Sequence, residues 1–419
     1  MRPSIRKTMF TQKYITPGND ALQSSNPKSF IIAGVTFKLV ALATGQLYAW
    51  ELPPEAEKLW DSATLYKDAS NPILQEFKLR GRYHGQYHDV KADGGDSSGW
   101  EDRRSRIGFD AKFLEKQLEL RVDFQSNDQF EDFYDGLVDA YLKWKPNKNF
   151  AVTLGKTKTL IAYGDWIPST NETPTFERSQ IFNQLGINRA TALTLEGDIQ
   201  GLLWQAGLYS NDTPATTRGS GAWGDGEFGE LGGGHAFSIG FGYDFNQELN
   251  VEKALVRLDW LHSEREASDL VLNRYDDIVS ATLILEEGDW NLTAEAFVAS
   301  GGDGVNGDVF GLYLQPTYDI IPKKLQLVGR YSFATGSGPA SVLAQSRYER
   351  ETPITPIPGV AGSGNRGDEY HAIYLGAQYF IYGDKLKLMA GAEWSRLSRE
   401  GHSTGYDGIT TFTGIRLSF

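Results

Sequence analysis

The sequence predicts an all-β protein, a transmembrane antiparallel β-barrel of about 16 strands with one loop folded into its interior. Three observations predict this fold. Apolar and polar residues alternate in many short segments, short and long connections between these segments take turns, and no run of about 18 uncharged apolar residues could form a membrane helix. A barrel wall needs such alternation because one face meets lipid and the other meets water.

The first alternating segment shows the pattern clearly. From Phe77 to His88 the odd positions are apolar, aromatic or glycine, and the even positions are polar. A soluble strand with one buried face would look the same, so the prediction depends on repetition. Such segments lie near residues 77–88, 104–113, 117–125, 137–145, 150–157, 187–196, 202–209, 236–245, 253–261, 278–285, 290–299, 309–318, 325–334, 369–380, 386–397 and 408–419.

The connections between these segments also alternate. Outer-membrane barrels have short periplasmic turns and long external loops, whereas a β-sandwich is not expected to keep that order through a whole chain. The short connections are residues 114–116, 146–148, 197–200, 287–289, 321–323 and 382–384. The long ones are residues 89–102, 126–135, 158–185, 211–234, 263–275, 301–306 and 336–368.

The chain ends in an alternating segment whose last residue is Phe419. This ending resembles the terminal strand by which the outer-membrane assembly machinery recognises its barrels, so Phe419 is assigned as an assembly signal. Aromatic residues near strand ends, such as Trp144 and Trp290, suit the interfacial girdles of a membrane barrel.

The N-terminal residues 1–43 are predicted to be a signal peptide. A basic start precedes an apolar stretch that ends in small residues, with cleavage expected after Ala43 or, as a second choice, after Ala49. Lys38 interrupts the apolar stretch, so an ordinary buried helix is the alternative. Residues 44–74 are predicted to be a periplasmic segment with a short helix that begins near Pro54 and ends by Pro72, and residues 75–419 the barrel.

Composition and motifs exclude several classes of function. The formal charge of -13 argues against nucleic-acid binding, and the absence of cysteine excludes disulfides and thiolate chemistry. No Gly-x-Ser-x-Gly, Walker or His-Glu-x-x-His motif is present, so we expect no enzyme and no cofactor. His84 and His88 face one side of a strand and permit a metal pair, but a polar lumen wall explains them equally well. The acidic segment 127–135 lacks the spacing of a calcium loop, so no metal site is assigned.

Basic residues recur on the side of the early strands that the alternation turns inward. Rings of Arg and Lys attract anions, so these side chains are predicted to line an anion path. An alternative remains open, because the carboxylates of Asp110, Glu119, Asp123 and Asp139 face the same lumen and could neutralise the wall. The predicted pore-lining residues are Lys78, Arg80, Arg82, His84, Arg104, Arg106, Arg121 and Lys143.

The stretch 156–186 is predicted to be the constriction of a channel. It is too long for an ordinary turn and too aromatic for a disordered segment, so a wide barrel interior is its natural place. Arg178 beside Glu177 could point into the pore or pin the loop to the wall. The residues assigned to the constriction are Lys156, Lys158, Tyr163, Phe176, Glu177 and Arg178.

Several motifs resemble the phosphate-selective porin O and P family. They are Arg-Arg-Ser-Arg-Ile-Gly-Phe at 103–109, Asp-Gly-Leu-Val-Asp-Ala-Tyr-Leu at 135–142, Thr-Phe-Glu-Arg-Ser at 175–179 and Gly-Ile-Asn-Arg at 186–189. The resemblance implies a trimeric porin in the outer membrane of a Gram-negative-type bacterium. It also implies a third loop inside the pore and a basic path for anions.

The sequence thus predicts a passive diffusion channel for small solutes, favouring anions such as phosphate. Its expected partners are outer-membrane lipid, small anionic solutes and two further copies of the chain, with no nucleic acid. Two alternatives remain. The barrel could be a general unselective porin, or a surface-binding, adhesin-like barrel whose external loops, notably 211–234 and 336–368, bind a partner.

Overall fold

The computed structural model describes residues 53–126, 133–210, 234–264, 272–302, 304–345, 347–352, 354–399 and 405–419. All of them belong to the unit Ala49–Phe419. The predicted signal peptide with both of its cleavage sites lies outside the described residues. So do most of the acidic segment 127–135 and nearly all of the predicted loop 211–234.

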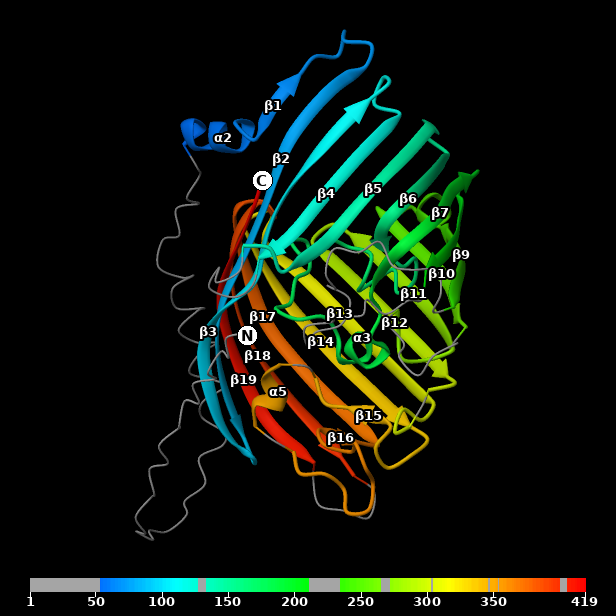
Figure 1. The fold of residues 1–419 in the computed structure, drawn as a ribbon. Coiled ribbons are helices and arrows are strands. Elements are labelled where there is room, and N and C mark those ends of the chain that lie inside the picture. The colour runs from blue at the N-terminus through cyan, green and yellow to red at the C-terminus, as the bar shows by residue number, and fades with distance from the viewer. Residues whose placement is uncertain are drawn as a thin grey trace, which may run out of the picture. The chain divides into compact units, whose positions relative to one another are not determined.

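Sixteen antiparallel strands form a closed barrel in which each strand pairs with the next and β19 pairs with β2 (Figure 1). Closure leaves no open sheet edge in the membrane, where unpaired backbone groups are costly. The barrel strands are β2 (Leu74–Ala92), β3 (Gly95–Phe113), β4 (Leu118–Ser126), β5 (Gly136–Asn147), β6 (Phe150–Lys158), β7 (Arg189–Ile199), β8 (Leu202–Ser210), β9 (His235–Asp244), β10 (Lys253–Ser263), β11 (Asp277–Glu287), β12 (Trp290–Ser300), β13 (Val309–Ile321), β14 (Leu325–Gly336), β17 (Glu369–Tyr382), β18 (Leu386–Ser398) and β19 (Tyr406–Ser418).

Each of the predicted alternating segments overlaps one of these strands, and the predicted fold class is confirmed. The predicted external loop 89–102 is wrong. β2 and β3 remain paired as far as Ala92 and Gly95 and turn at residues 93–94. In this extension the outward positions Asp89 and Lys91 are polar, whereas the inward Val90 is buried in a cluster with Tyr348 and Phe412. The polarity of the two faces is thus reversed, so the alternation could not reveal the extension.

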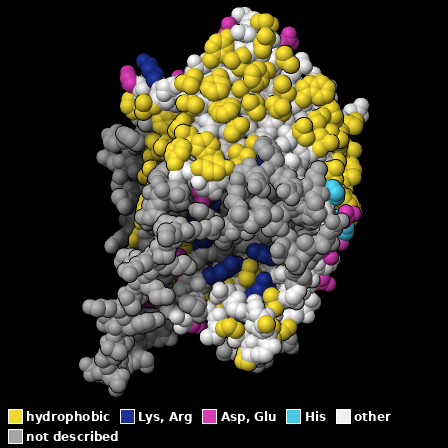
Figure 2. Space-filling view, in the orientation of Figure 1, with side chains coloured by type: hydrophobic (Ala, Val, Ile, Leu, Met, Phe, Trp, Pro, Cys, Tyr) yellow, Lys and Arg dark blue, Asp and Glu magenta, His cyan; other side chains and the backbone are white. Residues whose placement is uncertain are grey.

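The side chains of β2 follow the predicted inward and outward register. Leu79 and Tyr87 are 37% and 43% exposed, whereas His84 and His88 are 1% and 6% exposed. Figure 2 shows hydrophobic side chains gathered over the outer surface at the end of the barrel near β1. The outward face is therefore the lipid face, and the even positions of β2 point into the barrel.

The N-terminal segment packs where β2 and β19 meet. Its helix α2 (Pro54–Asp61) ends earlier than the sequence predicted, and β1 (Thr64–Lys67) follows and pairs with β2. β19 pairs with β2 only from Arg82 onward, so the preceding residues of β2 lack a partner on that side. β1 supplies one, because it pairs with residues 76–78 of β2. The indole Nε1 of Trp60 donates to the Ser418 carbonyl at 2.7 Å.

Phe419 lies against Gly81 of β2. The backbone N–H of each residue donates to the carbonyl of the other, at 3.2 Å and 3.1 Å. A Cβ atom at Gly81 would lie 2.2 Å from the Phe419 ring, so a side chain at this position would displace the terminal residue. Its role as an assembly signal stays a prediction.

Three short helices and one small sheet lie in the connections. Among the described residues, none of the helices is long and apolar enough to cross a membrane. The helices are α3 (Gln180–Leu185) between β6 and β7, α4 (Asn246–Leu249) between β9 and β10, and α5 (Tyr348–Glu351) between β14 and β17. In that last connection β15 (Val342–Leu343) pairs with β16 (Arg366–Gly367).

Candidate functional site

The β6–β7 loop, residues 159–188, reaches strands on several sides of the barrel. Its backbone hydrogen-bonds with Tyr209 of β8, Glu295 of β12, Arg330 of β14 and Arg416 of β19. Because these strands stand around the ring, a loop that contacts all of them crosses the interior. It is therefore placed to divide the lumen.

Lys156 and Lys158 lie on β6, although the sequence assigned them to the loop. Pairing of β6 with β7 continues as far as Lys158 and Arg189, so the loop begins at residue 159 and not at 156. The ammonium of Lys158 donates to the carbonyls of Trp166, Ile167 and Pro168 at 2.8 to 3.0 Å. Lys158 thus fixes the first turn of the loop.

Arg178 is held inside the loop and also borders open space. Its guanidinium lies 3.6 Å from the Asp165 carboxylate and 5.0 Å from the rings of both Trp166 and Phe182. Burial lowers the pKa of Arg178 to about 10, so it stays protonated at neutral pH. Asp165 also accepts from the Ser179 N–H and hydroxyl at the start of α3.

Glu177 forms a two-pronged ion pair with Arg103 of β3, whose Nε and Nη2 lie 2.6 Å and 2.7 Å from the carboxylate oxygens. Burial alone would raise the pKa of Glu177, but the Arg103 guanidinium outweighs it and holds that pKa well below its usual range. Arg103 is the extra residue of a β-bulge, since His84 pairs with Arg104 and Gly85 with Asp102.

Two aromatic residues assigned to the constriction contact the barrel wall and do not line the cavity described below. Phe176 stacks on Phe412 of β19, with ring centroids 5.1 Å apart. Tyr163 lies under the Arg257 guanidinium of β10, 4.7 Å from its ring centroid. Of the assigned constriction residues, Lys158 and Arg178 border the open space described next.

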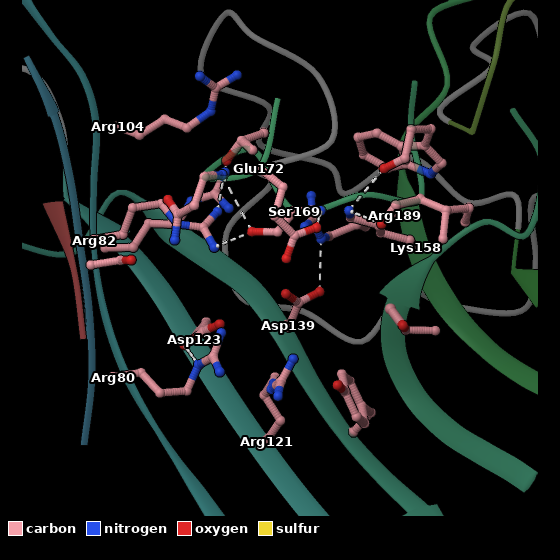
Figure 3. A pocket seen from close by; sticks show the side chains of 18 of the residues that line it. Arg80, Arg82, Arg104, Arg121, Asp123, Asp139, Lys158, Ser169, Glu172 and Arg189 are labelled. Carbon is pink, nitrogen blue, oxygen red and sulfur yellow. Dashed lines mark hydrogen bonds and ion pairs between the residues drawn. The ribbon is translucent and has the colours of Figure 1, made fainter. Parts of the chain in front are cut away.

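A cavity of about 580 Å³ lies between the β6–β7 loop and the wall formed by β2 to β7 (Figure 3). Its lining contains eleven basic and four acidic side chains among the described residues. The acidic ones are Asp123, Asp139, Glu172 and Glu196. The basic ones are Lys78, Arg80, Arg82, Arg104, Arg106, Arg121, Lys143, Lys158, Arg178, Arg189 and Lys385.

His84 is the one predicted pore-lining residue that this cavity excludes. Its Nε2 lies 2.8 Å from the Asn171 Oδ1 of the β6–β7 loop, and its side chain is buried. His88 instead contacts Glu351 at 3.0 Å, so the two histidines have separate partners. Within the described ranges no group of three or more His, Cys, Asp or Glu side chains could hold a metal ion.

Ion pairs neutralise one part of the cavity wall. Arg80 contacts Asp110 at 2.8 Å and Asp123 at 3.1 Å, and Arg121 shares Asp110 at 2.7 Å. Figure 3 shows Arg80 turned toward Asp123. Here the wall has the mixed charge of the alternative interpretation.

The rest of the wall keeps an excess of positive charge. Arg82 donates to the hydroxyls of Thr170 and Ser169, at 2.8 Å and 3.2 Å, instead of to a carboxylate (Figure 3). In the part of the chain that the structure describes, neither Arg82 nor Arg104 forms an ion pair, and the same holds for Lys78 and Lys385. An anion in this cavity therefore meets cations that no acidic side chain has neutralised.

Comparison with known proteins identifies the family. The model of the family described as phosphate-selective porin O and P matches residues 77–419. The chain belongs to this porin family. Its members are channels of the Gram-negative outer membrane, so the predicted family and location are confirmed.

Solved structures share the fold of this porin. OprB of Pseudomonas putida is 12% identical with a TM-score of 0.58, over 82% of this chain and 94% of that one. OmpF of Salmonella typhi, in a complex with daunomycin, is 13% identical with a TM-score of 0.56, over 82% and 98%. The outer membrane channel DcaP of Acinetobacter baumannii is 11% identical with a TM-score of 0.53, over 85% and 100%. A comparison with curated proteins gave no match.

A second loop of the porin packs inward. In the β14–β17 loop, residues 337–368, Ser341 accepts a hydrogen bond from Gln184 of α3 at 2.8 Å. Arg347 contacts Glu101 of β3 at 2.7 Å, and α5 touches β2 and β19. This part of the predicted partner-binding loop is thus engaged by the porin itself.

Glu349 makes the packing of the β14–β17 loop dependent on pH. It accepts hydrogen bonds from Tyr370 at 2.6 Å and the Gln345 N–H at 2.8 Å, and it faces Glu393. Burial raises the pKa of Glu349 to about 7. The pKa of Glu349 is thus higher in the folded protein than in the unfolded chain. Protonated Glu349 therefore stabilises the packing of the loop fully below about pH 4.5, and this contribution is lost as pH rises through about 7.

We therefore expect faster amide exchange in the β14–β17 loop at pH 8.5 than at pH 5.5, beyond the intrinsic change in rate. Hydrogen–deuterium exchange with mass spectrometry measures it, with the β8 strand as internal reference. Glu349→Gln, which stays neutral, should remove the excess. If Glu349→Gln shows the same excess of amide exchange at pH 8.5, a titratable group other than Glu349 causes the pH dependence and the prediction is wrong.

Two basic residues of the cavity are not among the pore-lining residues that the sequence predicts. Arg189 lies at the start of β7 and contacts Asp139 at 2.7 Å, and Lys385 lies in a short turn before β18. The alternation predicts which side chains of a strand point inward, but it does not extend into turns and loop ends.

Proposed function

We propose that this porin conducts small anions in preference to cations, along the space between the β6–β7 loop and the wall of β2 to β7. The observation that carries the proposal is the excess of basic over acidic side chains in the cavity, with Arg82 and Arg104 lacking a carboxylate partner among the described residues. Low-dielectric walls focus the field of such charges and raise the local concentration of anions.

Conductance in three salts tests the proposal. In planar bilayers, changing KCl to LiCl replaces the cation with a slower one, and changing KCl to potassium acetate replaces the anion with a slower one. An anion path predicts a large fall in acetate and little change in LiCl. The opposite result would refute it.

We also propose that phosphate is among the permeating anions. The family description names phosphate, and guanidinium groups match phosphate oxygens with paired donors. The hydroxyls of Ser169 and Thr170 beside Arg82 add further donors. Inorganic phosphate should reduce single-channel chloride current at concentrations where acetate does not, and equal inhibition by both anions would argue for a site without phosphate preference.

A general porin is the second candidate. The ion pairs of Arg80 and Arg121 favour it, because they show that part of the wall is neutral. Equal changes in LiCl and potassium acetate would support it. A barrel that only binds partners at its surface would show no ohmic current steps.

We propose a homotrimer in outer-membrane lipid, as membership of the family suggests. Chemical cross-linking in detergent micelles should give a band at three times the monomer mass that boiling in detergent does not remove. If cross-linking gives only the band of the single chain, the protein is not a trimer.

A further inference from the structure

The inward face of the last strand, β19, holds the β6–β7 loop. Three successive inward positions take part, each two residues from the next: Phe412, Gly414 and Arg416. Because β19 also closes the barrel against β2, this face stands beside the wall that carries Arg82.

The hydrogen bonds that the structure describes between Arg416 and the loop all end at backbone carbonyl oxygens. Nη1 donates to the carbonyls of Thr170 and Thr173 at 2.7 Å each, and Nη2 donates to those of Thr175 and Phe176 at 2.8 Å and 3.0 Å. The side chain is 3% exposed and does not border the cavity. Four acceptors arranged around one planar fork fit a guanidinium and not a lysine ammonium.

The other two positions complete the contact. The Phe412 ring stacks on Phe176 with centroids 5.1 Å apart and planes 18° apart. At Gly414 a Cβ atom would lie 2.9 Å from the Phe176 ring and 2.7 Å from the Gly85 carbonyl, so a larger residue would move the loop. At the start of the same loop segment, the hydroxyls of Ser169 and Thr170 accept hydrogen bonds from Arg82.

We infer that Arg416 is a positioning residue that sets the width of the pore by holding residues 170–176 against β19. It acts through its hydrogen-bond geometry, whereas the cavity arginines act through their charge. The inference rests on the proposed channel function but not on its preference for anions. It can therefore be tested even if the channel conducts anions and cations equally.

Arg416→Lys tests this inference because it keeps the charge and removes the fork. We expect larger and noisier single-channel currents in 1 M KCl, and entry of larger polyethylene glycols in a polymer-exclusion series. Phe176→Leu, a change in the loop itself, should shift the same two readouts in the same direction and cannot prevent barrel closure.

Arg399→Lys is the matched control. Arg399 also donates to backbone carbonyls, those of Arg366, Thr355 and Ser363, but these belong to the β14–β17 loop. It should leave the polymer cutoff unchanged. The inference is overturned if Arg416→Lys conducts like the parent protein, or if Arg399→Lys shifts the cutoff as much as Arg416→Lys does. If Arg416→Lys does not fold, an unchanged cutoff in Phe176→Leu overturns it.

Discussion

The double substitution Arg82→Ala and Arg104→Ala is expected to reduce single-channel conductance in 10 mM KCl by roughly fivefold or more. The reason is electrostatic, since a unit charge about 4 Å away contributes about 1 kcal/mol even at the dielectric constant of water. Screening is weak here, with a Debye length of about 30 Å at 0.01 M against about 3 Å at 1 M. Conductance in 1 M KCl should therefore change little.

Arg396→Ala is the control for this experiment. It removes one positive charge from an exposed side chain of β18 that is not part of the cavity lining. Its conductance should match the parent at both salt concentrations. An equal proportional loss for the double variant in 10 mM and 1 M KCl would show a change of pore shape and not of charge.

Glu177→Ala is expected to destabilise the protein by about 3 kcal/mol or more, because removing one partner leaves the other charge buried. Arg103 and Glu177 expose only 16% and 8% of their side chains. Urea unfolding in detergent micelles, followed by tryptophan fluorescence, measures the loss. The depressed pKa of Glu177 means that this stabilisation is present above about pH 4.5 and is lost only as pH falls through the lower folded pKa.

The double variant Arg103→Met, Glu177→Met closes a thermodynamic cycle with the single variants Arg103→Met and Glu177→Met. It removes both charges together, so it should be clearly more stable than Glu177→Ala. If the double variant loses as much stability as the sum of the two single changes, the ion pair contributes nothing specific to the placement of the loop.

Alternation was sufficient to predict the barrel, because a strand between lipid and water must change polarity at every residue. It placed Arg82 and Arg104 on the inner side without any structure. It failed at Arg103, because a β-bulge adds a residue and turns two successive arginines inward. A bulge has no signal in the polarity pattern of a single sequence.

The division of the arginines into separate roles was also beyond the sequence. Arg80, Arg82 and Arg416 all occupy inward positions of β2 or β19. Their partners are carboxylates for Arg80, hydroxyls of the loop for Arg82 and loop carbonyls for Arg416. These partners lie about 30 to 250 residues away along the chain, so only the folded barrel shows which guanidinium is free to meet a solute.

The zero-current potential of the purified porin across a KCl gradient tests the central claim most directly. The basic cavity predicts a potential that shows chloride permeating better than potassium, with the preference weaker when the gradient is set up at high salt. A potential near zero, or one that shows a preference for potassium, would contradict the anion path. It would mean that the lumen carboxylates balance or outweigh the cations.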